Sequence, residues 1–276
     1  MSIAQEMIPP RPAPPAVRPP LTRARVIGWI TLGIWLLLVA QLLLMLVSNW
    51  DVEKFVRYGP RYWDGLLITV MLVSLSVVMG AILSLPVTFA RMSKNPVLQT
   101  VSFAFVYTFR GTPLLAQLFL IYYGLGSFRS AFESVGLWWF FRDALYCSLL
   151  ALTLNTAAYQ AEILRGAIES VPRGQREGAA SLGLSKTVTF FKIILPQALI
   201  VALRPYGNEI ILLIKGSTVV SIVTVFDIMG QTRYTFSRTF DYQAYLWAAV
   251  FYLTIVEGMR QVLGAVEAGL TWHLKR

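Results

Sequence analysis

The sequence predicts an all-α integral membrane protein with about six transmembrane helices, and its composition gives the first reason. Apolar residues make up 56% of the 276 residues, and charged residues make up only 14%. Soluble domains contain roughly 45–50% apolar and about 25% charged residues, so this composition excludes an ordinary soluble protein. The second reason is that uncharged runs long enough to cross a hydrocarbon layer of about 30 Å recur along the chain.

Six segments are candidate spans. Four have at most one charge, which is Arg110 in the third of them, and they cover residues 26–47, 65–90, 95–128 and 144–161. Two are weaker: residues 197–226 hold Arg204, Glu209 and Lys215, and residues 242–256 form a short run before Glu257. Helices are expected throughout because every backbone polar group must be satisfied within the lipid.

Lys and Arg residues predict the orientation of these spans. With the N-terminus inside, 14 of them fall in cytoplasmic segments and seven fall on the opposite side. Cytoplasmic loops carry an excess of Lys and Arg, so both termini are expected in the cytoplasm. Six spans, an even number, also place the two termini on the same side of the membrane. The net charge of +10 follows from this topology and requires no nucleic acid partner.

The N-terminal region has its own composition. Seven of the 14 prolines lie in residues 1–25, which predicts an extended or disordered tail rich in Pro and Arg. The apolar run that follows has 22 residues, 26–47, and a secretory signal usually has roughly 7 to 15. We therefore expect an uncleaved first helix.

Metal and disulfide chemistry have little support in the sequence. Cys147 is the single cysteine and lies in an apolar run, so it has no second thiol to pair with. His273 is the single histidine. Zinc sites use clusters of Cys and His ligands, so we expect no metal site.

The loop between the fourth and fifth spans, residues 162–196, is the longest cytoplasmic loop. Pro172 and Gly174 break a first helical piece, and "QREGAASL" restarts a helix that Gly183 stops. Ser185 can cap the amphipathic run that continues to Pro196. This pattern predicts a short helix held crosswise at the membrane surface by two turns.

A nucleotide-binding loop is an alternative interpretation of the same segment. Gly178 and Gly183 have the spacing of the two glycines in a phosphate-binding G-x-x-x-x-G-K-[ST] loop. Leu184 occupies the position of the required Lys, however, and no strand precedes the loop. We therefore exclude nucleotide binding here, and any energy source must lie in another protein.

The same loop resembles a known family. Glu177, Ala179 and Gly183, followed by "IILP" at 193–196, resemble the EAA signature of permease subunits in bacterial ABC importers. Gly178 stands where that family usually has Ala. "FRGTPLLAQLFLIYYGLG" and the segment from "LALTLNTAAYQ" to "GAASLGLS" are similar to the polar amino-acid uptake branch, of the histidine, glutamine and arginine type. The resemblance covers residues 62–276.

The resemblance implies a fold and partners. It implies a five-helix ABC importer permease core with one extra N-terminal helix, in the bacterial inner membrane. The implied partners are an ABC ATPase dimer, which binds ATP and Mg, a periplasmic amino-acid-binding protein, and a second permease subunit, either a paralogue or a second copy. The chain itself is then not an enzyme. The implied substrates are polar amino acids, of basic histidine, arginine or lysine type, or opines.

The short helix would be the cytoplasmic coupling helix that docks on the ATPase. Glu177 would make the charged contact, and Gly183 would allow the turn. The residues that the resemblance assigns to this coupling are Arg173, Gly174, Arg176, Glu177, Gly178, Ala179, Ala180, Leu182 and Gly183.

Ionisable groups at membrane depth suggest a substrate path. Arg110 precedes Gly111 and Pro113, and we expect a second interrupted helix at Pro205 and Gly207. Arg110 would bind the carboxylate of an amino acid and Glu209 its ammonium group. Alternatively, these two residues pair with each other or hold a subunit interface, and polar residues such as Asn155 bond across helices. The candidate path residues are Arg110, Thr112, Asn155, Tyr159, Asn208, Glu209, Lys215 and Ser217.

A different functional class stays open on the sequence alone. An independent secondary transporter or channel would need internal repeats and its own coupling-ion site. We see no convincing repeat between the two halves of the chain.

Overall fold

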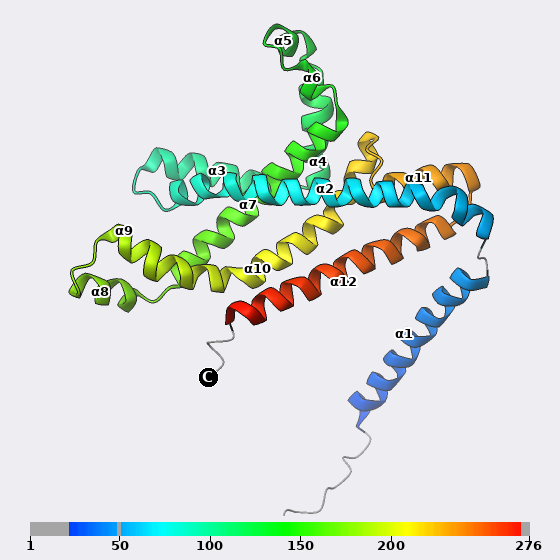
Figure 1. Cartoon of the computed structure of the whole chain (residues 1–276), viewed down its shortest axis with the longest axis horizontal. Helices are drawn as coiled ribbons and strands as arrows, with labels where there is room; N and C mark the ends of the chain where they lie inside the picture. Colours follow the sequence, from blue (N-terminus) through cyan, green and yellow to red (C-terminus); the bar gives the residue numbers. More distant parts are fainter. Residues whose placement is uncertain (1–21, 49–50, 272–276) are drawn as a thin grey trace, which may run out of the picture. The chain divides into compact units, whose positions relative to one another are not determined.

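The computed structural model describes residues 22–48 and 51–271, which form two compact units, one from each range (Figure 1). Most of the predicted tail, residues 1–21, lies outside the described residues, as does His273. The first unit contains α1 (Arg23–Ser48), which has no buried residue. Its apolar side chains are exposed all round the helix, as expected of a span that faces lipid. This helix covers residues 26–47 and is long and apolar enough to cross a membrane, as the sequence predicted.

The second unit is built from helices. The long ones are α2 (Val52–Arg91), α3 (Pro96–Gly111), α7 (Ala144–Ser170), α10 (Leu195–Gly216), α11 (Ile228–Thr239) and α12 (Gln243–Thr271). The short ones are α4 (Leu114–Phe119), α5 (Arg129–Ser134), α6 (Trp138–Phe141), α8 (Arg173–Ser181) and α9 (Lys186–Thr189). π-helical turns cover Leu120–Gly124 and Phe190–Ile194, and a 3₁₀ helix covers Ser217–Val223.

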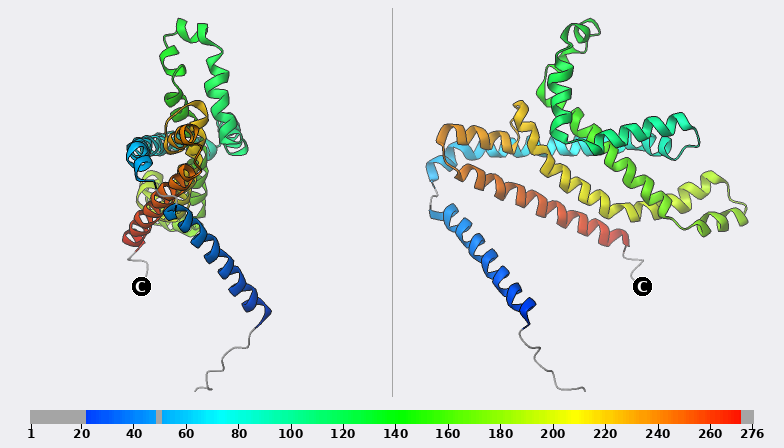
Figure 2. Two further views of the ribbon diagram at one scale, coloured as in Figure 1. Left: turned by 90° about the vertical axis from the view of Figure 1, so that its right-hand side faces the viewer. Right: turned by 180° about the vertical axis from the view of Figure 1, so that it is seen from behind.

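Helix α7 lies at the centre of this unit and packs against α2, α3, α4 and α10, as Figures 1 and 2 show. Gly80 lets α2 approach α7 closely, because a Cβ atom there would lie 2.6 Å from Cγ2 of Thr156. The main apolar core joins Leu72 of α2, Leu118 of α4 and Leu152 of α7. The residues of α7 are thus held in place from several sides.

The number of spans differs from the prediction. Within residues 22–48 and 51–271, four helices are long and apolar enough to cross a membrane, or five if the bent pair of α3 and Leu114–Gly124 counts as one span. Helix α7 is not among them, so the count of six is not confirmed. The reason is its composition, because α7 carries polar side chains along its length, such as Asn155 and Gln160, which lie buried within the protein.

Several predicted boundaries were also wrong. Helix α2 begins at Val52 instead of residue 65, because Asp51 caps it by accepting a bond from the backbone N of Lys54 at 3.2 Å. The last span continues past 256 to Thr271. Within the predicted span 95–128, by contrast, α3 and the segment Leu114–Gly124 meet at an angle of 109°, which confirms the interruption expected at Gly111 and Pro113.

The interruption expected at Pro205 and Gly207 is absent, which is a further correction. Both residues lie inside α10, and one helical stretch runs from Lys186 to Val223 through a π-helical turn and Pro196. Membrane helices tolerate such prolines because local π and 3₁₀ adjustments satisfy the freed backbone groups. Beyond the π-helical turn at Phe190–Ile194, the helix type changes at Ser217, where a 3₁₀ helix begins.

Candidate functional site

The predicted coupling helix corresponds to α8, and local chemistry sets its ends. Val171 is extended and Pro172 follows it, which separates α8 from α7. At the other end Gly183 has φ +71°, the backbone N of Leu184 bonds to the O of Ala179 at 3.0 Å, and the N of Gly183 bonds to the O of Ala180. This pair of bonds is a Schellman motif, which requires a left-handed residue. The structure therefore confirms the turn at Gly183.

Helix α8 exposes most of its surface. Ala179 is its one buried residue, at 3% exposure. Arg176 anchors the helix to α7, because its Nη2 donates a hydrogen bond to the backbone O of Ile168 at 3.3 Å. The other coupling candidates are exposed: Arg173, Gly174, Glu177, Gly178, Ala180, Leu182 and Gly183. The helix thus has a small anchor and a large free face.

An apolar pocket of about 440 Å³ lies behind α8, which the sequence interpretation missed. Ile168, Leu184 and Phe190 line it, and Arg176 and Lys186 also contribute to its lining. The amphipathic character of the run that begins at Ser185 was the available signal, because its apolar side needs a covered surface.

The break between α3 and α4, at Thr112 and Pro113, is held by a network of side-chain hydrogen bonds. Thr112 is extended, and Nε2 of Gln117 donates to the backbone O of Phe109 at 2.8 Å and to the O of Thr112 at 3.0 Å. Nδ2 of Asn155 donates to the O of Phe109 at 3.1 Å and to Oε1 of Gln117 at 3.0 Å. Two amide side chains therefore satisfy the carbonyl groups that the break frees, as membrane depth requires.

Asn155 accordingly bonds across helices, which was one of the two alternatives. Gln117 is a functional candidate that the sequence interpretation missed. Its only signal was a polar residue within the apolar run "PLLAQLFL". Thr112 takes part in the same network, because its Oγ1 accepts a bond from Nε2 of Gln117 at 2.9 Å.

Arg110 and Glu209 contact different side chains of α7. The guanidinium of Arg110 stacks over the ring of Tyr159, with its Cζ 5.1 Å from the ring centroid. Glu209 is 6% exposed, and its Oε1 accepts a bond from Oγ1 of Thr156 at 3.2 Å. Arg110 and Glu209 form no direct ion pair with each other among the described residues. Thr156 and Tyr159 are three positions apart, so both charges lie beside the same turn of α7.

The remaining candidate residues of the substrate path lie in two different places. A Cβ added at Gly216 would lie 3.3 Å from Cδ2 of Leu114, so the start of the 3₁₀ helix meets the break between α3 and α4. Lys215 is exposed at this junction, and Ser217 is buried and donates to the backbone O of Ile214. Asn208 instead lines a pocket of about 320 Å³ beside α12. The structure does not place Asn208 with Arg110.

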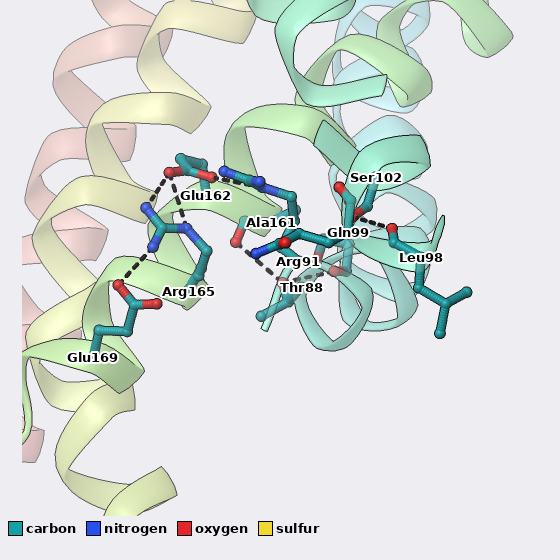
Figure 3. A network of polar contacts seen from close by, with 10 residues as sticks. Thr88, Arg91, Leu98, Gln99, Ser102, Ala161, Glu162, Arg165 and Glu169 are labelled. Carbon is teal, nitrogen blue, oxygen red and sulfur yellow. Dashed lines mark hydrogen bonds and ion pairs between the residues drawn. The ribbon is translucent and has the colours of Figure 1, made fainter. Parts of the chain in front are cut away.

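A network of charges ties α2 to α7 between the path and α8 (Figure 3). Arg165 bonds to Glu162 through Nε at 3.0 Å and to Glu169 through Nη1 at 2.5 Å. Nε of Arg91 lies 3.8 Å from Oε2 of Glu162. Arg91, Arg110 and Glu162 also line a pocket of about 270 Å³. One carboxylate is therefore shared between two guanidinium groups at this level.

Comparisons with known proteins agree with this architecture. Residues 76–266 match the family described as binding-protein-dependent transport system inner membrane component. The chain is 37% identical over 226 residues to a nopaline transport system permease protein of Agrobacterium fabrum, which covers 82% of this chain and 94% of that protein. It is 39% identical over 218 residues to a histidine/lysine/arginine/ornithine transport system permease protein of Escherichia coli K12, which covers 79% and 91%.

Solved structures support the same conclusion. A chain from the crystal structure of an amino acid ABC transporter with histidines has a TM-score of 0.70 and 32% identity, and the match covers 79% of this chain and 98% of that one. A methionine ABC transporter in an inward-facing conformation shares the fold, with a TM-score of 0.60 and 20% identity. These matches favour a permease subunit over an independent secondary transporter. The chain belongs to the family of binding-protein-dependent transport system inner membrane components and is the transmembrane subunit of an ABC importer.

Proposed function

We propose that the chain carries basic amino acids, of histidine, arginine or lysine type, or opines into the cell. Two relatives support this substrate class, since one is named for nopaline and the other for histidine, lysine, arginine and ornithine. All of these molecules bear carboxylate and cationic groups. Residues 62–276 form the permease domain in this proposal, and the loop 162–196 lies in the cytoplasm together with both termini.

Arg110 is the proposed carboxylate ligand on the path, and Glu209 is the proposed partner for an ammonium group. The supporting observation is that an exposed guanidinium lies beside a helix break, where the backbone approaches a pocket of about 270 Å³. Discontinuous helices at membrane depth commonly form substrate sites.

The Arg110→Ala variant tests this role. We expect loss of substrate uptake with unchanged expression and assembly, because the cation that binds the carboxylate is removed. Arg129→Ala is the matched control, since Arg129 is an exposed arginine paired with Glu133 far from the break. Unchanged uptake in Arg110→Ala would leave Arg110 with a structural role.

Helix α8 is the proposed contact with an ABC ATPase dimer, which binds the ATP and Mg. The single observation that carries this proposal is an exposed helix held to α7 by Arg176 and fixed by the turn at Gly183. A helix with stiff ends moves as a rigid body when a partner pushes on it. A periplasmic amino-acid-binding protein and a second permease subunit complete the proposed transporter.

Glu177→Lys tests the coupling. We expect the variant to insert normally but to lose uptake and copurification of the ATPase, because the charge reversal repels a cationic contact. Glu53→Lys makes the same change at an exposed position at the start of α2 and should keep both properties. Persistence of both uptake and copurification in Glu177→Lys would reject α8 as the coupling element.

A further inference from the structure

The apolar pocket behind α8 lies where the long helices end. Met92 directly follows the last residue of α2, Ile168 lies two residues before the end of α7, and Ile194 lies near the start of the stretch Lys186–Val223. Helix α2 and that stretch are both long and apolar enough to cross a membrane. The pocket is therefore level with the ends of two spans, which is the depth of lipid head groups.

The lining of this pocket combines two kinds of side chain. Two of the lining residues, Arg176 and Lys186, are cations, and neither forms an ion pair among the residues that the structure describes. No acidic residue is among the described residues that line it. The apolar lining residues are Met92, Ile168, Ala180, Leu184, Phe190 and Ile194. A ligand that matches both kinds carries a negative charge on an apolar body.

The carboxylates of the surrounding loop do not neutralise these two cations. Residues 162–196 contain five Lys and Arg residues and three Glu residues. Glu162 and Glu169 are both paired with Arg165, and Glu177 is exposed on α8 and does not line the pocket. Arg176 donates one hydrogen bond to the backbone of α7, and a guanidinium has five N–H donors, so others remain for a ligand.

An anionic phospholipid meets these requirements. Basic pockets between membrane helices on the cytoplasmic side bind anionic head groups, and Arg binds phosphate through paired hydrogen bonds. We propose that an anionic phospholipid of the inner leaflet occupies this pocket, with its phosphate at Arg176 and Lys186 and its first acyl methylenes against Leu184 and Phe190. A free phosphate ion would leave the apolar lining uncovered, and two cations would repel a basic amino acid.

The lipid would support α8 from behind. This helix buries only Ala179 against the rest of the chain, so a lipid between α8 and the end of α7 supplies contacts that the chain alone lacks. The inference rests on the proposed function, which places the loop 162–196 in the cytoplasm, beside a negatively charged leaflet. It adds a lipid to the parts that hold the coupling helix.

Photolabelling of the complete transporter in lipid nanodiscs tests the site. The probe is phosphatidylglycerol with a diazirine near the carboxyl end of one acyl chain, and phosphatidylcholine with the same chain is the neutral comparison. We expect phosphatidylglycerol to label residues 184–194 several-fold more strongly than phosphatidylcholine, as measured by peptide mass spectrometry. Lys186→Gln should lower this labelling about fivefold, because one basic residue near a membrane surface contributes about that factor.

Lys94→Gln is the matched control and should label like the wild type. Lys94 is also an exposed lysine, between α2 and α3, but it does not line the pocket. Equal labelling by the two lipids, or equal labelling of the two variants, would overturn the inference. Labelling of the isolated chain but not of the complete transporter would also overturn it, and would assign the pocket to an apolar side chain of the ATPase.

Uptake by the same preparations separates this inference from the proposed function. If the wild type imports basic amino acids or opines while residues 184–194 stay unlabelled, only the lipid site is wrong. If the pocket is labelled as expected but no substrate of this class is imported, the proposed substrate class is wrong and the lipid site stands.

Discussion

Helix α8 and the break between α3 and α4 are both short departures from long helices, but they are built in opposite ways. The break is bonded internally, because Gln117 and Asn155 donate four hydrogen bonds to its carbonyl and amide oxygens. Helix α8 buries one side chain and holds to α7 through Arg176. Its ends are fixed by backbone conformation at Pro172 and Gly183.

The difference follows from the surroundings of each element. At membrane depth no water replaces a lost hydrogen bond, so side chains must satisfy every freed carbonyl group. At an exposed surface water can bond to freed carbonyl groups, so backbone stiffness alone can set the shape of a helix such as α8. The break is therefore expected to be sensitive to side-chain changes, and α8 is expected to be sensitive to backbone changes.

Gln117→Leu should have the largest effect on stability. The change leaves the carbonyl of Thr112 without its donor and removes one of the two bonds of Asn155, whose Nδ2 keeps its bond to the O of Phe109. An unsatisfied buried group costs about 1–3 kcal/mol. We expect the transporter to lose about 3 kcal/mol of stability, seen as a lower midpoint of thermal unfolding in detergent. Gln99→Leu is the control, because Gln99 is an exposed glutamine on α3. Equal midpoints for the two variants would contradict the role of Gln117.

Gly183→Ala should act on α8 through the backbone. Gly183 has φ +71° and no atom within 4 Å of an added Cβ, so strain rather than a clash decides the outcome. A left-handed Ala costs roughly 1–2 kcal/mol. We expect amide hydrogen exchange in α8 to become about tenfold faster, with no change in the unfolding midpoint of the bundle. A shifted unfolding midpoint with unchanged amide exchange in α8 would show that Gly183 stabilises the bundle rather than the end of α8.

Gly178→Ala should have a smaller effect of opposite sign. Gly178 lies within α8, also has open space around an added Cβ, and has no positive φ. Ala is favoured over Gly in a helix by about 1 kcal/mol. Amide exchange in α8 should therefore slow by a few fold. If both glycine variants shift the exchange in the same direction, backbone conformation is not what fixes α8.

The contact of Asp241 with Lys54 should contribute the least. Nζ of Lys54 donates to Oδ2 of Asp241 at 2.8 Å, and this bond lowers the pKa of Asp241. Stability from a lowered pKa is present above the unfolded pKa and disappears as the pH falls through the folded value. Partly exposed pairs give at most about 1 kcal/mol.

Asp241→Asn measures this contribution. The variant should unfold at a slightly lower temperature than the wild type at pH 7, and this difference should shrink as the pH falls below the ordinary pKa of an Asp toward the lowered folded value. The difference should also shrink in high salt, because the pair is exposed. A difference between the two proteins that stays constant from pH 7 to pH 3 would rule out the ion pair as its cause.

Features that depend on neighbouring residues were predictable from the sequence. Pro172, Gly183 and Ser185 set the boundaries of α8 and α9 through local rules, and the structure has them at these positions. The side chain of Ser185 caps α9 by accepting from the backbone N of Val188 at 3.3 Å. The helices that cover residues 26–47 and 144–161 were predictable as helices, because apolar runs report lipid or core contact directly, although α7 is not among the helices apolar enough to span a membrane.

Features that depend on distant partners were not predictable. Glu209 looked available as an ion-pair partner, but Thr156 from another helix binds its carboxylate. Pro205 looked like a break, but it lies inside α10, which continues to Gly216. Gln117 gave little signal, because its three partners, Phe109, Thr112 and Asn155, come together only after α3, α4 and α7 pack.

The unbroken stretch from Lys186 to Val223 has a mechanical consequence. It begins a few residues after α8 and reaches Lys215 beside the break. This is a lever arm of about 44 Å at 1.5 Å per residue. A tilt of about 5° at the end near α8 would displace the far end by about 4 Å, about three quarters of the pitch of one helical turn. Leverage of this size would convert a small stroke beneath the membrane into a movement large enough to open or shut a passage for one amino acid.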